Sequence, residues 1–387
     1  MTRETIADDA AGAQSPRAEP RTELPPRRSS WKRLELALLA AVLTAELGWT
    51  LLPPPRDWVE SVYSRGLYRW IARAVVPVAD QVPFSLSLVL CAAAAVFLPA
   101  LAIVRWRSTR RAGASRLAAL GRTGLALAKA FVVGYGTFLL VWGAGYGRRP
   151  LTDRLGLEVV PVEAANVERW VGRLAAAIER DLPPPELRCR ESALASLRSS
   201  LEQVVAHWDG STPVLPVQVK RLPPGTLLVW GSVGVTIPWL LEAHVDGAEP
   251  DVAWLATATH ELAHVAGLCG EADADFAAAL AGLRTEDRYA RYAIELWLYR
   301  RFLDELAPRD AIAAFERLPP LAREDIEHSR RAYQAHVIPA LSAVQSHVYE
   351  RYLRSQRVTA GLKEYSWVTR LLVAAERRQL VQWNEQK

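Results

Sequence analysis

Cysteine is scarce in this chain of 387 residues, which has three cysteines and no CxxC pair. This excludes a cysteine zinc cluster and a disulfide framework as the basis of the fold. Cys91 lies in an apolar run. Cys189 and Cys269 are either one disulfide in an oxidising compartment or two unpaired buried thiols, and the sequence leaves that choice open.

The chain also lacks the basic stripe with interleaved aromatic residues that is typical of nucleic-acid-binding domains. Its formal net charge is +5, and acidic and basic residues are mixed throughout residues 150 to 387. The arginines fall mainly in two clusters beside apolar runs. We therefore expect neither a nucleic-acid nor a nucleotide partner.

Long apolar runs crowd one part of the chain, residues 34 to 144. Three runs there are long enough to cross a bilayer of about 30 Å as helices. They predict transmembrane helices over 34–53, 84–104 and 123–144. The first run is longer than a typical signal-peptide core and has no clear cleavage site, so we expect an uncleaved anchor.

The charge pattern predicts how these spans are oriented. Basic residues precede the first span and fill the loop between the second and third, RWRSTRRAGASRLAALGR, and such loops face the cytoplasm. Residues 1–33 are then a disordered cytoplasmic tail, since they are polar and rich in proline. Residues 58–76 have the pattern of an amphipathic helix at the outer interface, and residues 145–387 form an extracytoplasmic domain.

Helical periodicity dominates that last domain. From residue 161 onward apolar residues recur at spacings of three and four, and prolines separate the runs. The one convincing strand signal is LLVWGSVGVTIPWLL, at residues 227–241. The sequence therefore predicts a mainly α fold, with three transmembrane helices followed by a mostly helical domain that contains a small β-sheet.

One motif in this domain indicates chemistry. HELAH, at residues 260–264, is an HExxH pattern on a predicted helix. His260 and His264 project from one face and can bind one Zn²⁺, while Glu261 can take a proton from water at the metal. In the competing interpretation the two histidines are ordinary residues of a packed helix.

A third protein ligand must follow the motif. The spacing allows Glu271 or Asp273, whereas Gly270 stands where metzincin-type proteins place a histidine. We favour Glu271, because Asp275 lies one turn later and completes a pattern that resembles the third-ligand helix of gluzincin-type peptidases. Asp275, and Asp273 beside it, are then expected to orient the ligands.

Several segments together resemble an uncharacterised bacterial family of multi-span membrane proteins with an outer HExxH domain, domain of unknown function 3810. The segments are VYSRGLYRWIARAV, PFSL, WGAGYGRRPL, VTIPWLLEAHVD, HELAHVAGLCGEADADF, DRYARYAIEL and VYERYLRSQRVTAGLKEYSWVTRLL. The resemblance implies a zincin-like zinc peptidase in the bacterial cytoplasmic membrane. Two departures are that Glu271–Asp275 read EADAD where relatives tend to have EDEAN, and that His244 replaces a usual asparagine.

The resemblance also suggests two further roles. Ile237, Pro238 and Trp239 resemble the edge strand that aligns a peptide in zincins, with Glu242 just beyond it. Tyr292 is a candidate donor to the oxyanion of a tetrahedral intermediate. Packing roles are equally compatible with the sequence: a strand that only covers the helix, and an aromatic side chain between helices.

The expected function is a membrane-anchored zinc metallopeptidase that hydrolyses envelope proteins or peptides outside the membrane. Its expected partners are membrane lipid and a peptide or protein substrate. The alternative is a zinc-binding sensor or scaffold without turnover, for which Glu261 would be unnecessary. A site within the bilayer is disfavoured, because the HELAH helix is too short and too polar to span.

Overall fold

The computed structural model describes residues 28–358, 361 and 367–381. Most of the predicted tail, residues 1–33, lies outside the described residues. The first helix, α1, begins at Arg28 and ends at Leu51.

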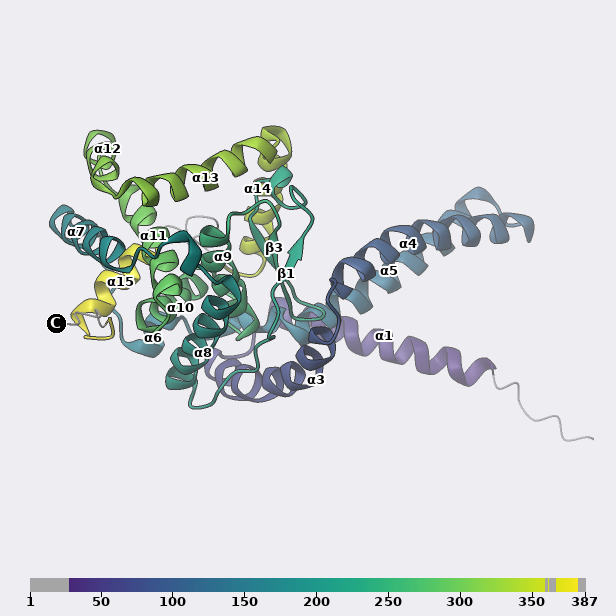
Figure 1. Cartoon of the computed structure of the whole chain (residues 1–387). Coiled ribbons are helices and arrows are strands. Elements are labelled where there is room, and N and C mark those ends of the chain that lie inside the picture. The colour runs from purple at the N-terminus through teal and green to yellow at the C-terminus, as the bar shows by residue number, and fades with distance from the viewer. Residues whose placement is uncertain (1–27, 359–360, 362–366, 382–387) are drawn as a thin grey trace, which may run out of the picture.

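Three helices are long and apolar enough to cross a membrane: α1, α4 (Leu86–Arg111) and α5 (Arg116–Val141). They project from the globular part of the molecule (Figure 1). This confirms that the three predicted apolar runs form long helices, and it is consistent with a membrane protein. The second and third helices extend further into the basic loop than predicted, because the turn between them takes only residues 112–115. The Ser115 hydroxyl caps the start of α5.

Close contact joins α1 to α5. A Cβ at Gly136 would lie 2.9 Å from both Glu46 Oε1 and Val42 Cγ1, so only glycine fits there without movement. Lys129 Nζ and Glu35 Oε1 form an ion pair at 2.7 Å between the same helices. The charged residues of the spans therefore face a partner helix, as membrane-embedded charges generally do.

One helical stretch connects α1 to α4: α2 (Arg56–Trp58), η1 (Val59–Leu67) and α3 (Tyr68–Asp80). Val59 and Tyr63 are buried in the core of the globular part, and the Tyr68 hydroxyl donates to the Val265 carbonyl at 2.7 Å. The helix predicted over 58–76 is thus present, and one side of it belongs to the globular core. Its opposite side exposes Trp70, so contact with the membrane interface stays a prediction.

The globular part is built mostly from helices whose starts are set by proline or by short turns. Pro308, Pro320 and Pro339 each occupy the first position of a helix, where the missing N–H is not needed. The helices are α6 (Leu151–Leu155), α7 (Ala164–Asp181), α8 (Arg190–Asp209), α9 (Asp251–Val265), α10 (Glu271–Arg284), α11 (Arg288–Leu303), α12 (Pro308–Arg317), α13 (Pro320–His336), α14 (Pro339–Ser355) and α15 (Val368–Arg377). Short 3₁₀ segments are η2 (Gly143–Gly147), η3 (Pro185–Leu187) and η4 (Leu228–Trp230).

The sheet has three strands in the order β1-β3-β2: β1 (Lys220–Leu222), β2 (Gly234–Ile237) and β3 (Glu242–Asp246). The central strand β3 is parallel to β1 and antiparallel to β2. The predicted fold class, mainly α with a small β-sheet, is therefore confirmed, and β2 is an edge strand of this sheet.

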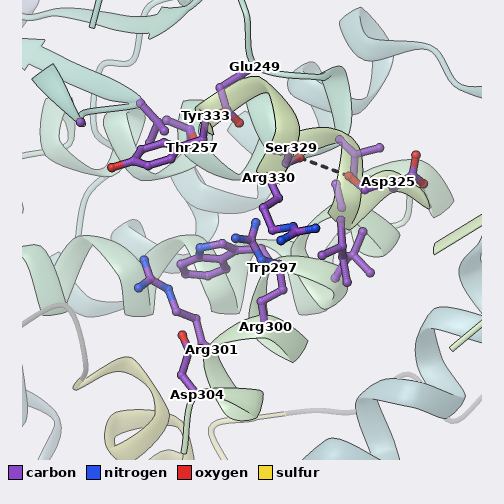
Figure 2. Close-up of a pocket in the computed structure, with 17 residues that line it drawn as sticks. Glu249, Thr257, Trp297, Arg300, Arg301, Asp304, Asp325, Ser329, Arg330 and Tyr333 are labelled. Carbon is purple, nitrogen blue, oxygen red and sulfur yellow. Dashed lines mark hydrogen bonds between the residues drawn. The ribbon is translucent and has the colours of Figure 1, made fainter. Parts of the chain in front are cut away.

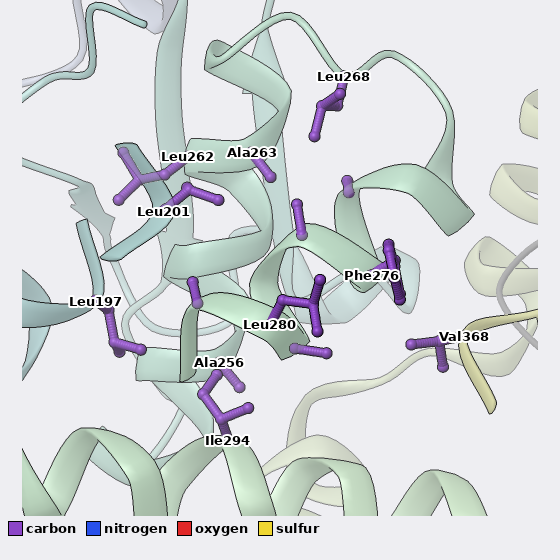
Figure 3. Packing of buried hydrophobic residues seen from close by; sticks show 14 of the residues in the cluster. Leu197, Leu201, Ala256, Leu262, Ala263, Leu268, Phe276, Leu280, Ile294 and Val368 are labelled. Carbon is purple, nitrogen blue, oxygen red and sulfur yellow. The ribbon is translucent and has the colours of Figure 1, made fainter. Parts of the chain in front are cut away.

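The core centres on α9 and α10, which pack against α8 and α11 (Figure 3). Leu262, Phe276 and Leu280 are buried in it. Gly282 allows α10 to approach α11, since a Cβ there would lie 2.2 Å from Ile294 Cγ1. Polar side chains on α9 and α10 consequently lie deep in the protein.

The cysteines are free thiols. Cys189 is exposed, whereas Cys269 is buried with its Sγ 3.8 Å from the Trp142 carbonyl. The disulfide that the sequence left open is therefore absent from this structure.

Candidate metal centre

Both histidines of the HELAH motif are held through Nδ1. His260 Nδ1 lies 2.6 Å from Asp275 Oδ1, and His264 Nδ1 lies 2.7 Å from the Leu268 carbonyl oxygen. Because a carbonyl oxygen only accepts, the Nδ1 of His264 must donate. In the neutral imidazoles the lone pairs are then on the Nε2 atoms, which is the arrangement that metal-ligating histidines usually have.

A sharp turn brings the third residue to them. Gly267 has φ +94°, in the left-handed region, and a Cβ there would lie 2.9 Å from the Tyr68 ring. This glycine ends the turn after α9, and α10 then starts at Glu271. The predicted ligand therefore stands at the first position of a helix that packs against the HELAH helix.

Glu271 Oε2 lies 3.2 Å from His260 Nε2 and 3.4 Å from His264 Nε2. With metal–ligand bonds of about 2.0–2.1 Å, two ligands of a tetrahedral zinc ion are about 3.3 Å apart. Glu271 is buried, and its Oε2 pairs with the two imidazole Nε2 atoms at these distances. A buried carboxylate oxygen facing two imidazole nitrogens fits a divalent cation.

The charges of the histidines and of the carboxylates shift one another's pKa values. Burial lowers the pKa of His260, but Asp275 and Glu271 outweigh it and raise the pKa well above its usual value. Burial raises the pKa of Glu271, yet the two histidines bring it well below its usual range. The centre therefore favours positive charge between the imidazoles and the carboxylate.

Glu261 lies beside these three residues without joining them. Its Oε2 accepts a hydrogen bond from the Thr236 hydroxyl at 2.7 Å, and a Cβ at Gly234 would lie 2.6 Å from its Oε1. Burial raises its pKa, although the positive field of the histidines opposes the shift. A carboxyl group with a raised pKa suits proton transfer near neutral pH.

All four side chains line one cavity of about 820 Å³. Its walls come from α5, η2, the edge strand β2 and α14. The other lining residues are Phe131, Gly134, Tyr135, Phe138, Trp142, Tyr146, Ser232, Gly234, Val235, Thr236, Pro238, Trp239, Gln345, Val348, Tyr349, Tyr352, Ser355 and Gln356.

The predicted substrate strand is placed in part at this cavity. Pro238 and Trp239 line it, but they follow β2 in a turn, and the residues of β2 that line it are Gly234, Val235 and Thr236. Ile237 ends the strand opposite Glu242. The strand at the cavity thus starts earlier than the sequence indicated.

Glu242 and His244 act elsewhere. Both are buried on the central strand β3. Glu242 accepts hydrogen bonds from the backbone N–H groups of Leu86 and Ser87, and His244 Nε2 lies 2.7 Å from Ser85 Oγ. These residues hold the start of α4, where a carboxylate is stabilised by the helix dipole. Glu242 lies beside the end of β2, opposite Ile237, but it does not line the cavity, so its role toward a substrate stays a prediction.

Tyr292 does not reach the metal ligands. It is buried on α11, does not line the cavity and donates its hydroxyl to Asp325 Oδ2 at 2.6 Å. Tyr349, by contrast, lines the cavity and donates its hydroxyl to Glu271 Oε1. The sequence contained this tyrosine within VYERYL, but nothing in the spacing linked α14 to the motif.

Asp273 is also turned away from the histidines. Burial raises its pKa to about 6, while Arg154 and Arg148 lower it. Of the two carboxylates predicted to orient ligands, only Asp275 contacts a histidine.

A second cavity of about 500 Å³ lies between α9, α11 and α13 (Figure 2). Arg300, Arg301 and Arg330 line it, together with the buried Glu249. Arg301 Nη2 lies 3.8 Å from Oδ2 of Asp275, the carboxylate that contacts His260. The second cavity is therefore next to Asp275, and its lining does not include His260, His264 or Glu271.

The fold and the three apolar helices define a mainly helical membrane protein with one HExxH motif. The chain belongs to the family described as Protein of unknown function (DUF3810), whose model matches residues 63–373. No curated protein and no solved structure matches the chain. The family expected from the sequence is confirmed.

Proposed function

We propose that this protein is a membrane-anchored zinc-dependent metallopeptidase in which His260, His264 and Glu271 hold the metal. One observation carries the proposal: both imidazole Nε2 atoms face a buried Glu271 Oε2 at 3.2 and 3.4 Å. The three ligand atoms lie within 4.8 Å of one another. Two histidines and a carboxylate are the ligand set of catalytic zinc in gluzincin-type enzymes, which leave a fourth position for water or substrate.

A bound Zn²⁺ would polarise both the attacking water and the carbonyl of the scissile peptide bond. Glu261 supplies the proton transfers: its carboxylate takes a proton from the attacking water and passes it to the leaving nitrogen. The Thr236 hydroxyl and the close approach of Gly234 fix the orientation of this carboxylate. The Tyr349 hydroxyl and Asp275 fix two of the three ligands.

The strand β2 is suited to aligning a peptide. Val233 O accepts from Asp246 N at 2.9 Å, and Val235 lies opposite His244 in the antiparallel register. Because alternate residues of such a strand bond to the partner strand, the backbone groups of Gly234 and Thr236 face the other way. The Gly234 carbonyl accepts from the Ser232 hydroxyl at 2.8 Å, so the backbone groups of Thr236 are the ones with which a substrate backbone can pair at the cavity wall.

The location follows from charge. Basic residues precede the apolar run of α1 and lie at the end of α4 and the start of α5, and the positive-inside rule assigns these ends to the cytoplasm. The globular part then lies outside the bacterial cytoplasmic membrane, and envelope proteins or peptides are the substrates. A zinc-binding sensor or scaffold would use the same three ligands but has no need of Glu261.

Metal removal tests the proposal. The full-length protein in detergent is treated with a chelator, dialysed and assayed on a quenched-fluorescent peptide library before and after Zn²⁺ is restored. We expect hydrolysis to disappear with the metal and to return with Zn²⁺ but not with Mg²⁺. Hydrolysis that survives complete removal of zinc would refute the peptidase, and a zinc-loaded protein without hydrolysis would favour the sensor.

A further inference from the structure

The candidate centre opens toward a wall formed by an apolar helix. Phe131, Tyr135 and Phe138, which we call the aromatic face of α5, line the same cavity as His260, Glu261 and His264. Their spacing of four and three residues places them on one side of the helix. α5 is one of the three helices long and apolar enough to cross a membrane.

The aromatic face reaches far along α5. Phe131 precedes Val141, the last residue of the helix, by ten residues, or about 15 Å at about 1.5 Å per residue. The apolar thickness of a bilayer is about 30 Å. If α5 spans the bilayer, the cavity extends from the globular part to about half the depth of the membrane.

The exposure of the aromatic side chains changes along α5. Phe131 is 70% exposed and Phe138 is 7% exposed, so the far end of the aromatic face is open and the near end is enclosed. The ring centroids of Phe131 and Tyr135 are 6.0 Å apart, and those of Tyr135 and Phe138 are 5.9 Å apart. The rings thus form a continuous apolar surface from the membrane level inward.

The same surface continues to the ligands. Phe138 contacts Tyr352 at a centroid distance of 6.2 Å, Tyr352 stacks on Tyr349 at 5.8 Å, and Tyr349 donates to Glu271. The edge strand β2 lies on the cavity too. An apolar path alone would fit an acyl chain, but an edge strand next to the Glu261 carboxylate fits a polypeptide backbone.

Building on the proposed peptidase, we propose that its substrate is a polypeptide anchored in the same bilayer, whose membrane segment lies along the aromatic face of α5. The residues just outside the membrane then extend along β2 and present their peptide bonds to Glu261. The class of substrate is a membrane protein or anchored peptide cleaved next to its span, rather than a freely diffusing peptide.

Photocrosslinking tests this path without requiring turnover. Full-length protein with Glu261→Gln is reconstituted in phosphatidylethanolamine/phosphatidylglycerol nanodiscs with benzoylphenylalanine in place of Phe131. The matched control has it in place of Phe97, which is 71% exposed on α4 and does not line the cavity. The probe is a Leu/Ala-rich helix of about 20 residues with a randomised ten-residue extension on the side of the globular part.

We expect several-fold more crosslinked probe from position 131 than from position 97. Wild type should also hydrolyse the anchored extension at least about tenfold faster than the same extension without its helix, because sharing a bilayer raises the effective concentration. Equal crosslinking at both positions, or crosslinking of phospholipid alone at 131, would overturn the inference.

The two proposals fail in distinguishable ways. Hydrolysis of both probes at equal rates would keep the peptidase and reject membrane entry. Selective crosslinking at 131 with no hydrolysis of either probe would keep the docking path and reject the peptidase. A circular-dichroism spectrum and a melting temperature equal to those of the parent protein verify that each labelled variant is folded.

Discussion

The hydroxyl of Tyr349 on α14 donates a hydrogen bond to Glu271 Oε1 on α10, 78 residues earlier in the chain. This bond occupies one oxygen of the carboxylate and leaves Oε2 facing the two histidines. Glu271 is thereby prepared to bind a metal through a single oxygen. The contact also ties α14, one wall of the cavity, to the metal centre.

Removing the Tyr349 hydroxyl should therefore impair the centre. We expect Tyr349→Phe to lower turnover or zinc affinity by about 10- to 100-fold, as is usual for groups that orient ligands. Hydrolysis rates and competition with a zinc chelator measure the two effects. Turnover and affinity equal to wild type would show that the bond has no such role.

Tyr292→Phe provides the comparison. Its hydroxyl contacts Asp325, not the metal ligands, so we expect unchanged turnover. Stability should fall by about 1.5–3 kcal/mol, the range for one hydrogen bond to a charged group, while Arg188 still pairs with Asp325. A large loss of turnover without loss of stability would restore the oxyanion role predicted from the sequence.

Asp275→Asn should weaken metal binding. The carboxylate lies 2.6 Å from His260 Nδ1 and keeps the Nε2 lone pair directed at the centre. An amide can bond there through its oxygen but carries no charge, so zinc affinity should fall about tenfold or more. Chelator competition measures it, with Asp273→Asn as the control on the same helix. Equal affinities for wild type and Asp275→Asn would contradict the assignment.

Gly234→Ala should displace Glu261 without touching a ligand. The new Cβ would lie 2.6 Å from both Glu261 Oε1 and Thr257 Cγ2, so the carboxylate must move. We expect turnover to fall about 10- to 100-fold, because a misplaced base loses its alignment, with zinc content unchanged. Gly172→Ala, where nothing lies within 4 Å of the added Cβ, should leave both properties intact. Full activity of Gly234→Ala would argue against Glu261 as the base.

The buried Glu249 should make stability depend on pH. Burial raises its pKa from 4.5 to about 7. Between these values the folded protein retains a proton that the unfolded chain has lost, so stability declines as pH rises toward 7 and levels off above it. Glu249→Gln should flatten this decline in melting temperatures measured from pH 5 to 8, whereas Glu163→Gln on the surface should not. An unaltered slope would show that another group controls the dependence.

The sequence predicted most of what depends on local periodicity and spacing. The apolar runs gave the three long helices, and the i, i+4 spacing of His260 and His264 put both rings on one face. Spacing left Glu271 and Asp273 as candidates for the third ligand, and the resemblance of the Glu271–Asp275 pattern to gluzincin-type peptidases favoured Glu271, whose carboxylate lies at the two histidines. Each of these inferences needs only one or two neighbouring helices.

What the sequence could not predict depends on contacts between distant segments. Tyr349 reaches Glu271 from α14, and Glu242 reaches the start of α4 across more than 150 residues. The sequence predicts a helix at the membrane interface over residues 58–76, yet Val59 and Tyr68 complete the globular core. Amphipathicity marks an apolar face but does not say whether lipid or protein covers it.

The most direct test needs the full-length protein, because residues after 145 do not contain the whole globular part. Zinc content and hydrolysis of a broad peptide library should be measured on the full-length protein for wild type, Glu271→Gln and Glu261→Gln. We predict about one zinc ion per chain with hydrolysis in wild type, little zinc in Glu271→Gln, and zinc without hydrolysis in Glu261→Gln. Wild-type protein that binds no zinc would contradict the account.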